Sequence, residues 1–220
     1  MSTSVQQPDS ASSQLRVSVA CFRWNGETIE TIVLSDKSLP SSIPDPCESL
    51  DVTATRVVKS IFDSAAAYIE QLYTFSYVSE SMRETVVSYI AIFSPDASGT
   101  IAWTPLESLG ELPERPSMVM NYATVRLRAK LEYTSIAFHL MPEAFTLAEL
   151  QLAYESILDA QLDKRNFRRR MATSGMLEET SEMRREGPHR PARLYRYNGR
   201  ADRSSYLTPP TSTPNGESNS

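Results

Sequence analysis

Cysteine and glycine are scarce in this sequence, and their scarcity excludes several kinds of site. The 220 residues include two cysteines and seven glycines. Cys21 and Cys47 lie far apart without CxxC spacing, so they cannot build a zinc site or a disulfide framework. The chain has no P-loop and no Rossmann glycine fingerprint, and no Ser-His-Asp or Cys-His arrangement has support. We therefore expect no metal and no cofactor, and an unreactive, buried Cys21.

Long apolar runs are missing as well. No stretch approaches the roughly 20 apolar residues that cross a bilayer. The N-terminus also lacks a basic region followed by an apolar stretch, which a signal peptide requires. These absences predict a cytoplasmic protein without a membrane partner.

Charge is distributed unevenly along the chain. The net charge is -5 and the sequence pI is about 5.2, which by themselves argue against a nucleic-acid partner. Residues 163–203, however, contain twelve Arg or Lys against six Asp or Glu. Such an asymmetry indicates a polyanionic partner for the basic part of the chain.

Composition and periodicity divide the chain into four segments. Residues 1–14 and 199–220 have little to bury and are predicted to be disordered tails. Residues 15–113 are predicted to form an α/β sandwich, because apolar alternation typical of strands flanks a stretch with helical spacing. The expected strands and helix lie at 15–21, 29–34, 50–72 (the helix), 73–78 and 85–93, with a loop at 39–46.

Residues 114–198 have a different pattern, typical of a winged helix. Helices are expected over 117–131, after the N-cap Thr146 with Glu149 completing a capping box, and after the N-cap Asp163 as far as about 173. Two short strands, 176–179 and 192–197, follow and are joined by a basic loop. The predicted fold class is thus an α/β sandwich followed by a mainly α winged helix-turn-helix domain.

The third of these helices separates apolar from basic residues. On a helical wheel Phe167 and Met171 share one side, and an Arg-rich face lies opposite. Such a helix can dock on its own domain while inserting into a DNA groove, where Arg pairs with phosphate or guanine and Asn with adenine. A solvated basic face without any partner is the alternative, and RNA is disfavoured because stacking aromatics are not interleaved. The predicted DNA-binding residues are Lys164, Arg165, Asn166, Arg168, Arg169 and Arg170 on the helix, and Arg184, Arg185, His189, Arg190 and Arg193 in the wing.

Five stretches of the chain resemble the Nudix-related transcriptional regulators. They are YIEQLYTF at 68–75, RLRAKLEYT at 126–134, PEAFTLAEL at 142–150, LDKRNFRRRM at 162–171 and RPARLYRY at 190–197. The resemblance covers about 15–197 and is strongest from Arg126 onward. It implies a Nudix-like domain joined to a C-terminal winged helix, a dimeric repressor, and an ADP-ribose-like or sugar effector.

The Nudix signature itself is degenerate. It is a Gly, five residues, a Glu, seven residues and then Arg-Glu-x-x-Glu-Glu, whose carboxylates hold Mg²⁺ against a diphosphate. Laid on this chain, Ser42 takes the Gly position, while Glu48 and Arg56 keep the first Glu and the Arg. The three carboxylate positions fall on Val57, Ser60 and Ile61. The resemblance therefore implies a Nudix-like domain that is not an enzyme.

Other positions of the resemblance also depart from the family. An Asp-His pair falls on Arg115-Pro116, a Pro-Gly-Gly turn reads Pro40-Ser41-Ser42, and Asp36-Lys37-Ser38 stands in place of an Arg-rich loop. An ADP-ribose site, a pocket for another ligand and a purely structural dimerisation domain all stay open. His139 lies in an apolar stretch and is interpreted as a core residue.

Taken together, these features predict a sequence-specific transcriptional regulator. We expect a homodimeric repressor that binds double-stranded DNA. Residues 15–113 would form a degenerate sensor or dimerisation domain, and residues 114–198 the DNA-binding domain. A Nudix hydrolase of nucleoside diphosphate derivatives and a scaffold protein that does not bind DNA are the alternatives.

Overall fold

The computed structural model describes residues 12–79, 82–185 and 191–199, which belong to two compact units. The first unit ends at Thr124 and the second begins at Val125, both within the helix α2 (Glu114–Tyr133). The boundary expected between residues 113 and 114 lies just before this helix. Most of the two segments predicted to be disordered tails lies outside the described residues.

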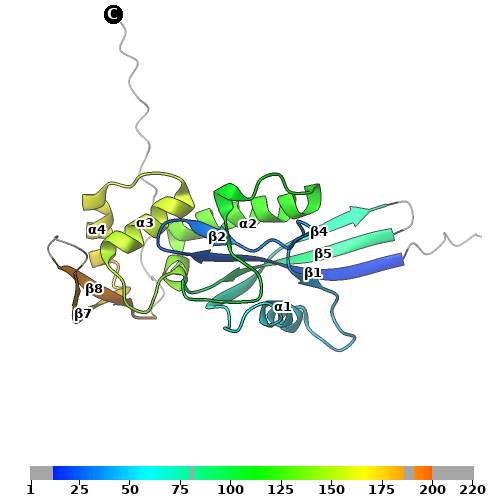
Figure 1. The fold of residues 1–220 in the computed structure, drawn as a ribbon, viewed down its shortest axis with the longest axis horizontal. Helices are drawn as coiled ribbons and strands as arrows, with labels where there is room; N and C mark the ends of the chain where they lie inside the picture. Colours follow the sequence, from blue (N-terminus) through cyan, green and yellow to red (C-terminus); the bar gives the residue numbers. More distant parts are fainter. Residues whose placement is uncertain (1–11, 80–81, 186–190, 200–220) are drawn as a thin grey trace, which may run out of the picture. The chain divides into compact units, whose positions relative to one another are not determined.

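A six-stranded mixed sheet forms the centre of the first unit (Figure 1). Its strands follow the order β4-β5-β1-β2-β6, and β3 pairs with β1. Strands β1 and β5 run parallel, and the other pairs are antiparallel. The strands are β1 (Ser12–Trp24), β2 (Ile29–Thr31), β3 (Ser41–Ser42), β4 (Tyr68–Val78), β5 (Met82–Ile92) and β6 (Thr104–Pro105), and the short 3-10 helix η1 (Leu106–Ser108) follows β6.

The first strand is longer than its apolar alternation suggested. Ser12, Ser13 and Gln14, which we expected in the N-terminal tail, pair with Met82, Arg83 and Glu84 of β5. Backbone hydrogen bonds in a ladder do not require apolar side chains, so polar residues can extend a strand beyond its buried part. The strand therefore begins at Ser12.

The helix expected over 50–72 was wrong in its second half. Helix α1 spans Leu50–Lys59, begins at the N-cap Ser49, whose hydroxyl accepts from the Val52 backbone N, and ends at Ser60. Ile61 and Phe62 then turn into the core, and Phe62 bridges to Gly99. Residues from Tyr68 onward form β4, because aromatic and β-branched side chains pack well in a sheet and pairing with β5 overrides the four-residue spacing.

Helices cover both faces of this sheet (Figure 1). The odd-numbered residues of β1 and β5, such as Val17, Val19 and Tyr89, pack with Val57 and Ile61 in one buried cluster. The even-numbered residues point to the other face, where Thr31 contacts Met120 on the first half of α2. The strand alternation thus separates a face sealed by α1 from a face covered by the start of α2.

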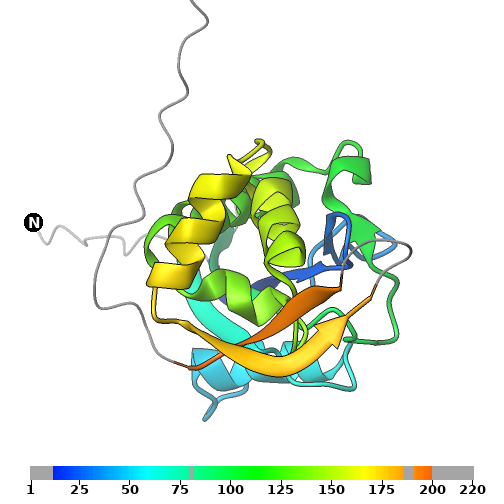
Figure 2. The same ribbon diagram turned by 90° about the vertical axis from the view of Figure 1, so that its left-hand side faces the viewer.

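The second unit contains the end of α2, three further helical elements and a two-stranded sheet (Figure 2). The elements are η2 (Ile136–Leu140, a 3-10 helix), α3 (Leu147–Leu158), α4 (Lys164–Thr173), β7 (Leu177–Arg184) and β8 (Ala192–Tyr197). Strand β7 runs well past the predicted 176–179. In the parts of the chain that the structure describes, no helix has the length and apolarity needed to span a membrane.

Candidate nucleic-acid interface and sensor-domain cavity

Helix α4 presents the polar face that its sequence predicts. The N-cap Asp163 accepts a hydrogen bond of 2.7 Å from the Asn166 backbone N, and Gly175 follows the helix with a positive φ of 69°. Phe167 and Met171 are buried, and the Tyr154 ring of α3 meets Phe167 edge-on at 5.3 Å. This packing fixes the rotation of α4 about its axis, which determines the side chains that face solvent.

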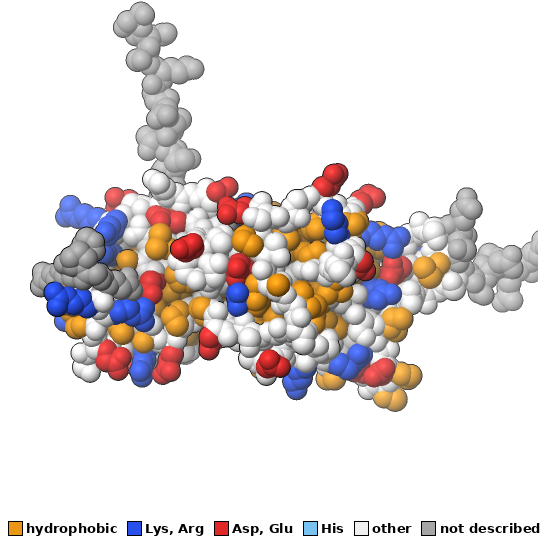
Figure 3. All heavy atoms as spheres, in the orientation of Figure 1, with side chains coloured by type: hydrophobic (Ala, Val, Ile, Leu, Met, Phe, Trp, Pro, Cys, Tyr) orange, Lys and Arg blue, Asp and Glu red, His pale blue; other side chains and the backbone are white. Residues whose placement is uncertain are grey.

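The face opposite Phe167 is exposed and basic. Arg169 donates from Nη2 to the Asn166 side-chain oxygen at 3.2 Å, so these two neighbours orient each other. Figure 3 shows Lys and Arg side chains gathered over α4 and the β7–β8 hairpin. The predicted helix residues that are exposed are Lys164, Arg165, Asn166, Arg168 and Arg169, and Arg170 is half-buried.

The helix before α4 is fixed at its start by a capping box. The Thr146 hydroxyl accepts from the Glu149 backbone N at 3.1 Å, and Glu149 accepts from the Thr146 backbone N at 2.7 Å. Both backbone N–H groups would otherwise lack partners at the helix end, so the box stabilises α3 where it meets the wing.

Arg184, predicted as a DNA contact, is bound within its own unit. Because β7 extends as far as Arg184, the side chain reaches α3 and donates to Glu149 Oε1 at 2.6 Å and to the Ala144 carbonyl at 3.0 Å. The wing is also joined to the segment before α3 by reciprocal backbone bonds between Phe145 and Tyr195, of 3.0 and 2.8 Å. The wing is therefore attached to the helix that supports α4.

The other predicted wing residues occupy different environments. Arg193 of β8 forms an ion pair with Glu179 of β7 across the hairpin. Arg185 is exposed just beyond β7. His189 and Arg190 lie outside the described residues. His139, expected in the core, is half-buried beside the Tyr197 ring, and desolvation lowers its pKa below the usual value.

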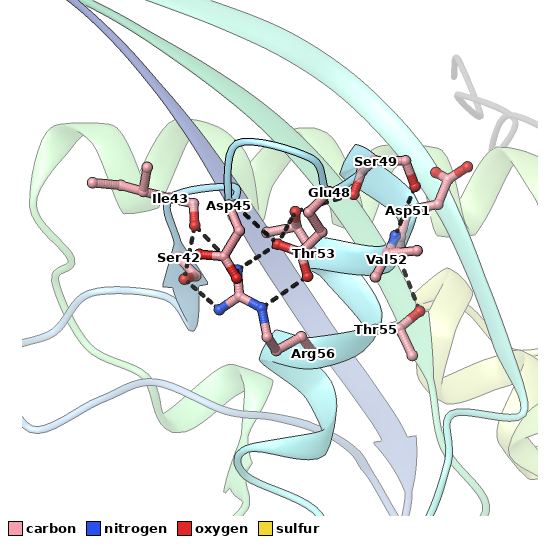
Figure 4. Close-up of polar contacts among 10 residues, drawn as sticks. All are labelled: Ser42, Ile43, Asp45, Glu48, Ser49, Asp51, Val52, Thr53, Thr55 and Arg56. Atoms are coloured by element: carbon pink, nitrogen blue, oxygen red, sulfur yellow. Dashed lines mark hydrogen bonds and ion pairs between the residues drawn. The ribbon is translucent and has the colours of Figure 1, made fainter.

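Three residues to which the sequence analysis assigned Nudix-signature positions, Ser42, Glu48 and Arg56, are joined by hydrogen bonds (Figure 4). Arg56 on α1 donates to both carboxylate oxygens of Glu48, from Nε at 2.9 Å and from Nη2 at 2.6 Å. Its Nη1 reaches the Ser42 hydroxyl at 2.9 Å, and Thr53 also donates to Glu48. The Arg56 guanidinium lowers the pKa of Glu48 to about 2. These bonds connect the loop before α1 to the helix itself.

Laid on the sequence, the signature's three carboxylate positions fall on Val57, Ser60 and Ile61. Val57 and Ile61 are buried in the core, with 4% and 7% of their surfaces exposed. The Ser60 hydroxyl donates to the Val57 carbonyl at 2.7 Å at the end of α1. Among residues 12–79, 82–185 and 191–199, no group of three or more His, Cys, Asp or Glu could hold a metal ion.

A cavity of about 390 Å³ lies on the sheet face that the start of α2 covers. It brings together residues of β1, β3, β4, β5, the 36–39 segment and the first turns of α2. Several of these positions are the ones where the sequence departs from the family, namely Asp36, Ser38, Ser41, Arg115 and Pro116. Sequence reasoning missed their neighbours Arg16, Tyr77 and Glu84, because no local pattern marks residues that meet only across a sheet.

Comparison with known proteins identifies the second unit. A family model described as the NrtR DNA-binding winged helix domain matches residues 137–197. Residues 137–197 form an NrtR-type winged helix domain. This domain contains α4, the basic face and the wing, and the resemblance inferred from the sequence is confirmed there.

Solved structures extend the likeness beyond the NrtR-type winged helix domain. Shewanella oneidensis NrtR complexed with a 27mer DNA has 26% identity and a TM-score of 0.76, covering 83% of this chain and 93% of that one. A MutT/nudix family protein from Enterococcus faecalis, at 17% identity, has a TM-score of 0.65 and covers 88% and 89%. The predicted fold class, a Nudix-like sandwich followed by a winged helix-turn-helix domain, is confirmed.

A curated relative matches over a shorter segment. The ADPR responsive transcriptional repressor NtrR of Acinetobacter baylyi is 48% identical over 79 residues, which are 36% of this chain. The matched segment spans 31% of that relative's length. The likeness therefore concerns part of each protein.

Proposed function

We propose that the protein is a sequence-specific transcriptional regulator that binds double-stranded DNA as a homodimer and acts as a repressor. The exposed Arg-rich face of α4 carries the proposal, because α4 lies within the residues that match an NrtR DNA-binding winged helix domain and would be its recognition helix. In such domains the recognition helix enters the major groove, and a dimer binds half-sites one or two helical turns apart.

The residues of α4 divide between two roles in this proposal. Arg165 and Asn166 lie on one turn of the exposed face and Arg169 on the next, where a guanidinium or an amide can contact base edges. Lys164 lies at the first turn, where its charge suits a phosphate oxygen. Arg185 at the end of the wing would contact the flanking backbone. Arg184 and Arg193, which are held by Glu149 and Glu179, instead keep the wing in place.

The first unit acts in this proposal as a sensor and dimerisation domain without catalytic activity. Glu48 and Arg56 keep the Nudix loop folded, but Val57, Ser60 and Ile61 supply no carboxylate to bind Mg²⁺ or activate water. An ADP-ribose-like or sugar effector would then modulate DNA binding rather than undergo hydrolysis.

The decisive experiment measures binding of the full-length protein to labelled intergenic DNA from beside its own gene, against excess random DNA and across a salt series. Wild type should bind the specific fragment with nanomolar affinity. The Arg165→Ala/Arg168→Ala variant should lose this binding while keeping its circular dichroism spectrum and oligomeric state. A Lys59→Ala/Arg83→Ala variant removes the same charge from exposed positions of the first unit and should bind normally.

Two results would contradict the proposal. Unchanged affinity of the α4 variant would show that this face does not contact DNA. Weak binding that is indifferent to sequence and lost between about 50 and 200 mM salt would indicate phosphate attraction alone and favour the scaffold alternative. Release of AMP from ADP-ribose with Mg²⁺, above a blank, would instead support the hydrolase alternative.

A further inference from the structure

The cavity of the first unit contains two guanidinium groups on either side of one carboxylate. Glu84 of β5 has 12% of its side chain exposed and accepts from Arg16 Nε at 2.9 Å and from Arg115 Nη1 at 2.6 Å. Two guanidiniums carry more N–H donors than a single carboxylate can accept. The cluster can therefore hold a second anionic group in addition to Glu84.

Asp36, another carboxylate among the lining residues, is hydrogen-bonded within its own turn. Asp36 Oδ1 accepts from the Ser38 backbone N at 3.0 Å and from the Ser38 hydroxyl at 2.6 Å. These bonds lower the pKa of Asp36, which stays ionised and turned toward Ser38. Asp36 therefore adds one fixed negative charge to the lining, opposite in sign to the charges of Arg16 and Arg115.

Tyr77 adds an unsatisfied polar atom to the same cavity. The Arg115 guanidinium lies over its ring, 4.5 Å from the ring centroid, and the Tyr77 backbone pairs with Glu84 in the β4–β5 ladder. Within the described part of the chain, the buried Tyr77 Oη has no hydrogen-bond partner. A buried phenol normally has one, so a ligand oxygen that enters when Arg115 shifts would complete this site.

The remaining lining residues indicate the size and chemistry of the part of the ligand that is not anionic. Ser18, Ser38 and Ser41 contribute hydroxyl groups, and Leu39, Val86 and Val119 contribute apolar surface. A volume of about 390 Å³ is near the lower end of the range for small-molecule sites. We propose that the cavity binds a sugar-sized, hydroxylated acid, a phosphate monoester or a carboxylate, whose anionic group is held by Arg16 and Arg115.

Ligand binding in this cavity does not depend on the proposed regulatory function. Only the effect of the ligand on DNA binding rests on that function. Arg115, Pro116 and Val119 belong to the first turns of α2, the helix in which the first unit ends and the second begins. A ligand that takes Arg115 away from Glu84 changes the contacts of these turns. Any resulting effect on DNA affinity must be matched by an equal effect of DNA on ligand affinity.

The test is calorimetric titration of the full-length protein, without DNA, with five probes: ribose 5-phosphate, gluconate, ribose, inorganic phosphate and ADP-ribose. At least one of the two hydroxylated acids should bind at least about tenfold more tightly than ribose and inorganic phosphate, because only these acids offer both an anionic group to the arginines and hydroxyl groups to the serines. Ribose 5-phosphate against gluconate distinguishes a phosphate from a carboxylate ligand. Because DNA is not present, the result does not depend on whether α4 binds an operator.

Substitutions of Arg115 test whether the acid binds in this cavity. Arg115→Met should weaken binding of the preferred acid by at least about tenfold, and Arg115→Lys should restore part of it. Arg83→Met is the matched control, because Arg83 is exposed on β5 next to Glu84 but on the opposite face of the sheet. Equal binding of ribose and ribose 5-phosphate, binding of ADP-ribose alone, no binding of any probe, or no effect of Arg115→Met would each overturn the proposal.

Discussion

Arg184 on strand β7 donates at 2.6 Å to the carboxylate of Glu149, which also closes the capping box of helix α3. One carboxylate thus joins the wing and the helix that supports α4. We predict that Arg184→Met lowers the free energy of unfolding by about 1 kcal/mol, a modest value because both side chains are partly exposed. Urea unfolding measures this effect.

The neighbouring residue provides a control with the opposite expectation. Arg185→Met should leave the unfolding free energy unchanged but weaken operator binding, because Arg185 is exposed at the end of the wing. Loss of stability in Arg185→Met, or an unaffected stability in Arg184→Met, would contradict this division of roles.

Lys164 should act on DNA affinity without affecting the choice of sequence. A lysine that neutralises one phosphate releases about one counterion, so Lys164→Ala should reduce the slope of log K against log salt by about 1. The same variant should lower the affinity for the specific fragment and for random DNA by a similar factor. A selective loss on the specific fragment would place Lys164 at a base edge instead.

Acid sensitivity should depend on the Glu48–Arg56 pair. The pKa of Glu48 is lowered to about 2 by Arg56, so the ionised carboxylate favours the folded state at pH values above its unfolded pKa of about 4.3. This stabilisation is lost as the pH falls toward 2. In Arg56→Gln the free energy of unfolding should therefore change less between pH 4.5 and 2 than in wild type. Parallel pH profiles for the two proteins would contradict this.

The two thiols should differ in reactivity. Cys21 is completely buried and its pKa is raised by desolvation, whereas Cys47 is exposed. In the native protein, iodoacetamide should modify Cys47 and leave Cys21 intact, as peptide mass analysis can show. Native Cys47→Ser should remain unmodified, and modification of Cys21 should appear only after unfolding.

Gly99 should tolerate no larger side chain. A Cβ built there would lie 2.3 Å from the Ile61 carbonyl oxygen and 2.9 Å from the Phe62 ring. Gly99→Ala should lower the free energy of unfolding by about 1–3 kcal/mol, because the backbone at Ile61 must shift. An unchanged melting temperature would show that the 97–101 segment moves away without cost.

Local patterns predicted the second unit well because its helices have distinct ends. Thr146 and Asp163 are N-caps in the structure as in the sequence, and the apolar pair Phe167 and Met171 gives the orientation of α4. The resemblance to a known family also supplied the Nudix-like fold of the first unit, which periodicity alone describes only as an α/β sandwich.

The errors arise where distant pairing determines the structure. Val57, Ile61 and Ala65 continue a helical spacing, but the ladder between β4 and β5 determines the conformation of residues from Tyr68 onward. The ion pair between Arg184 and Glu149 also depends on the length of β7, which the sequence did not indicate, and a DNA contact of Arg184 stays a prediction. The Arg16–Glu84–Arg115 cluster unites three segments far apart in sequence, so no spacing could reveal it.

If the first unit lacks catalytic activity, as we propose, the burial of Val57 and Ile61 makes a metal-binding carboxylate at these positions difficult to introduce. In this fold, glutamates introduced at these two positions would enter a packed apolar cluster rather than an open metal site. An unpaired carboxylate in such surroundings costs several kcal/mol or stays protonated, and in neither form would it bind Mg²⁺ well. A metal-binding carboxylate at either position would thus require repacking of the core beneath α1, which no single substitution supplies.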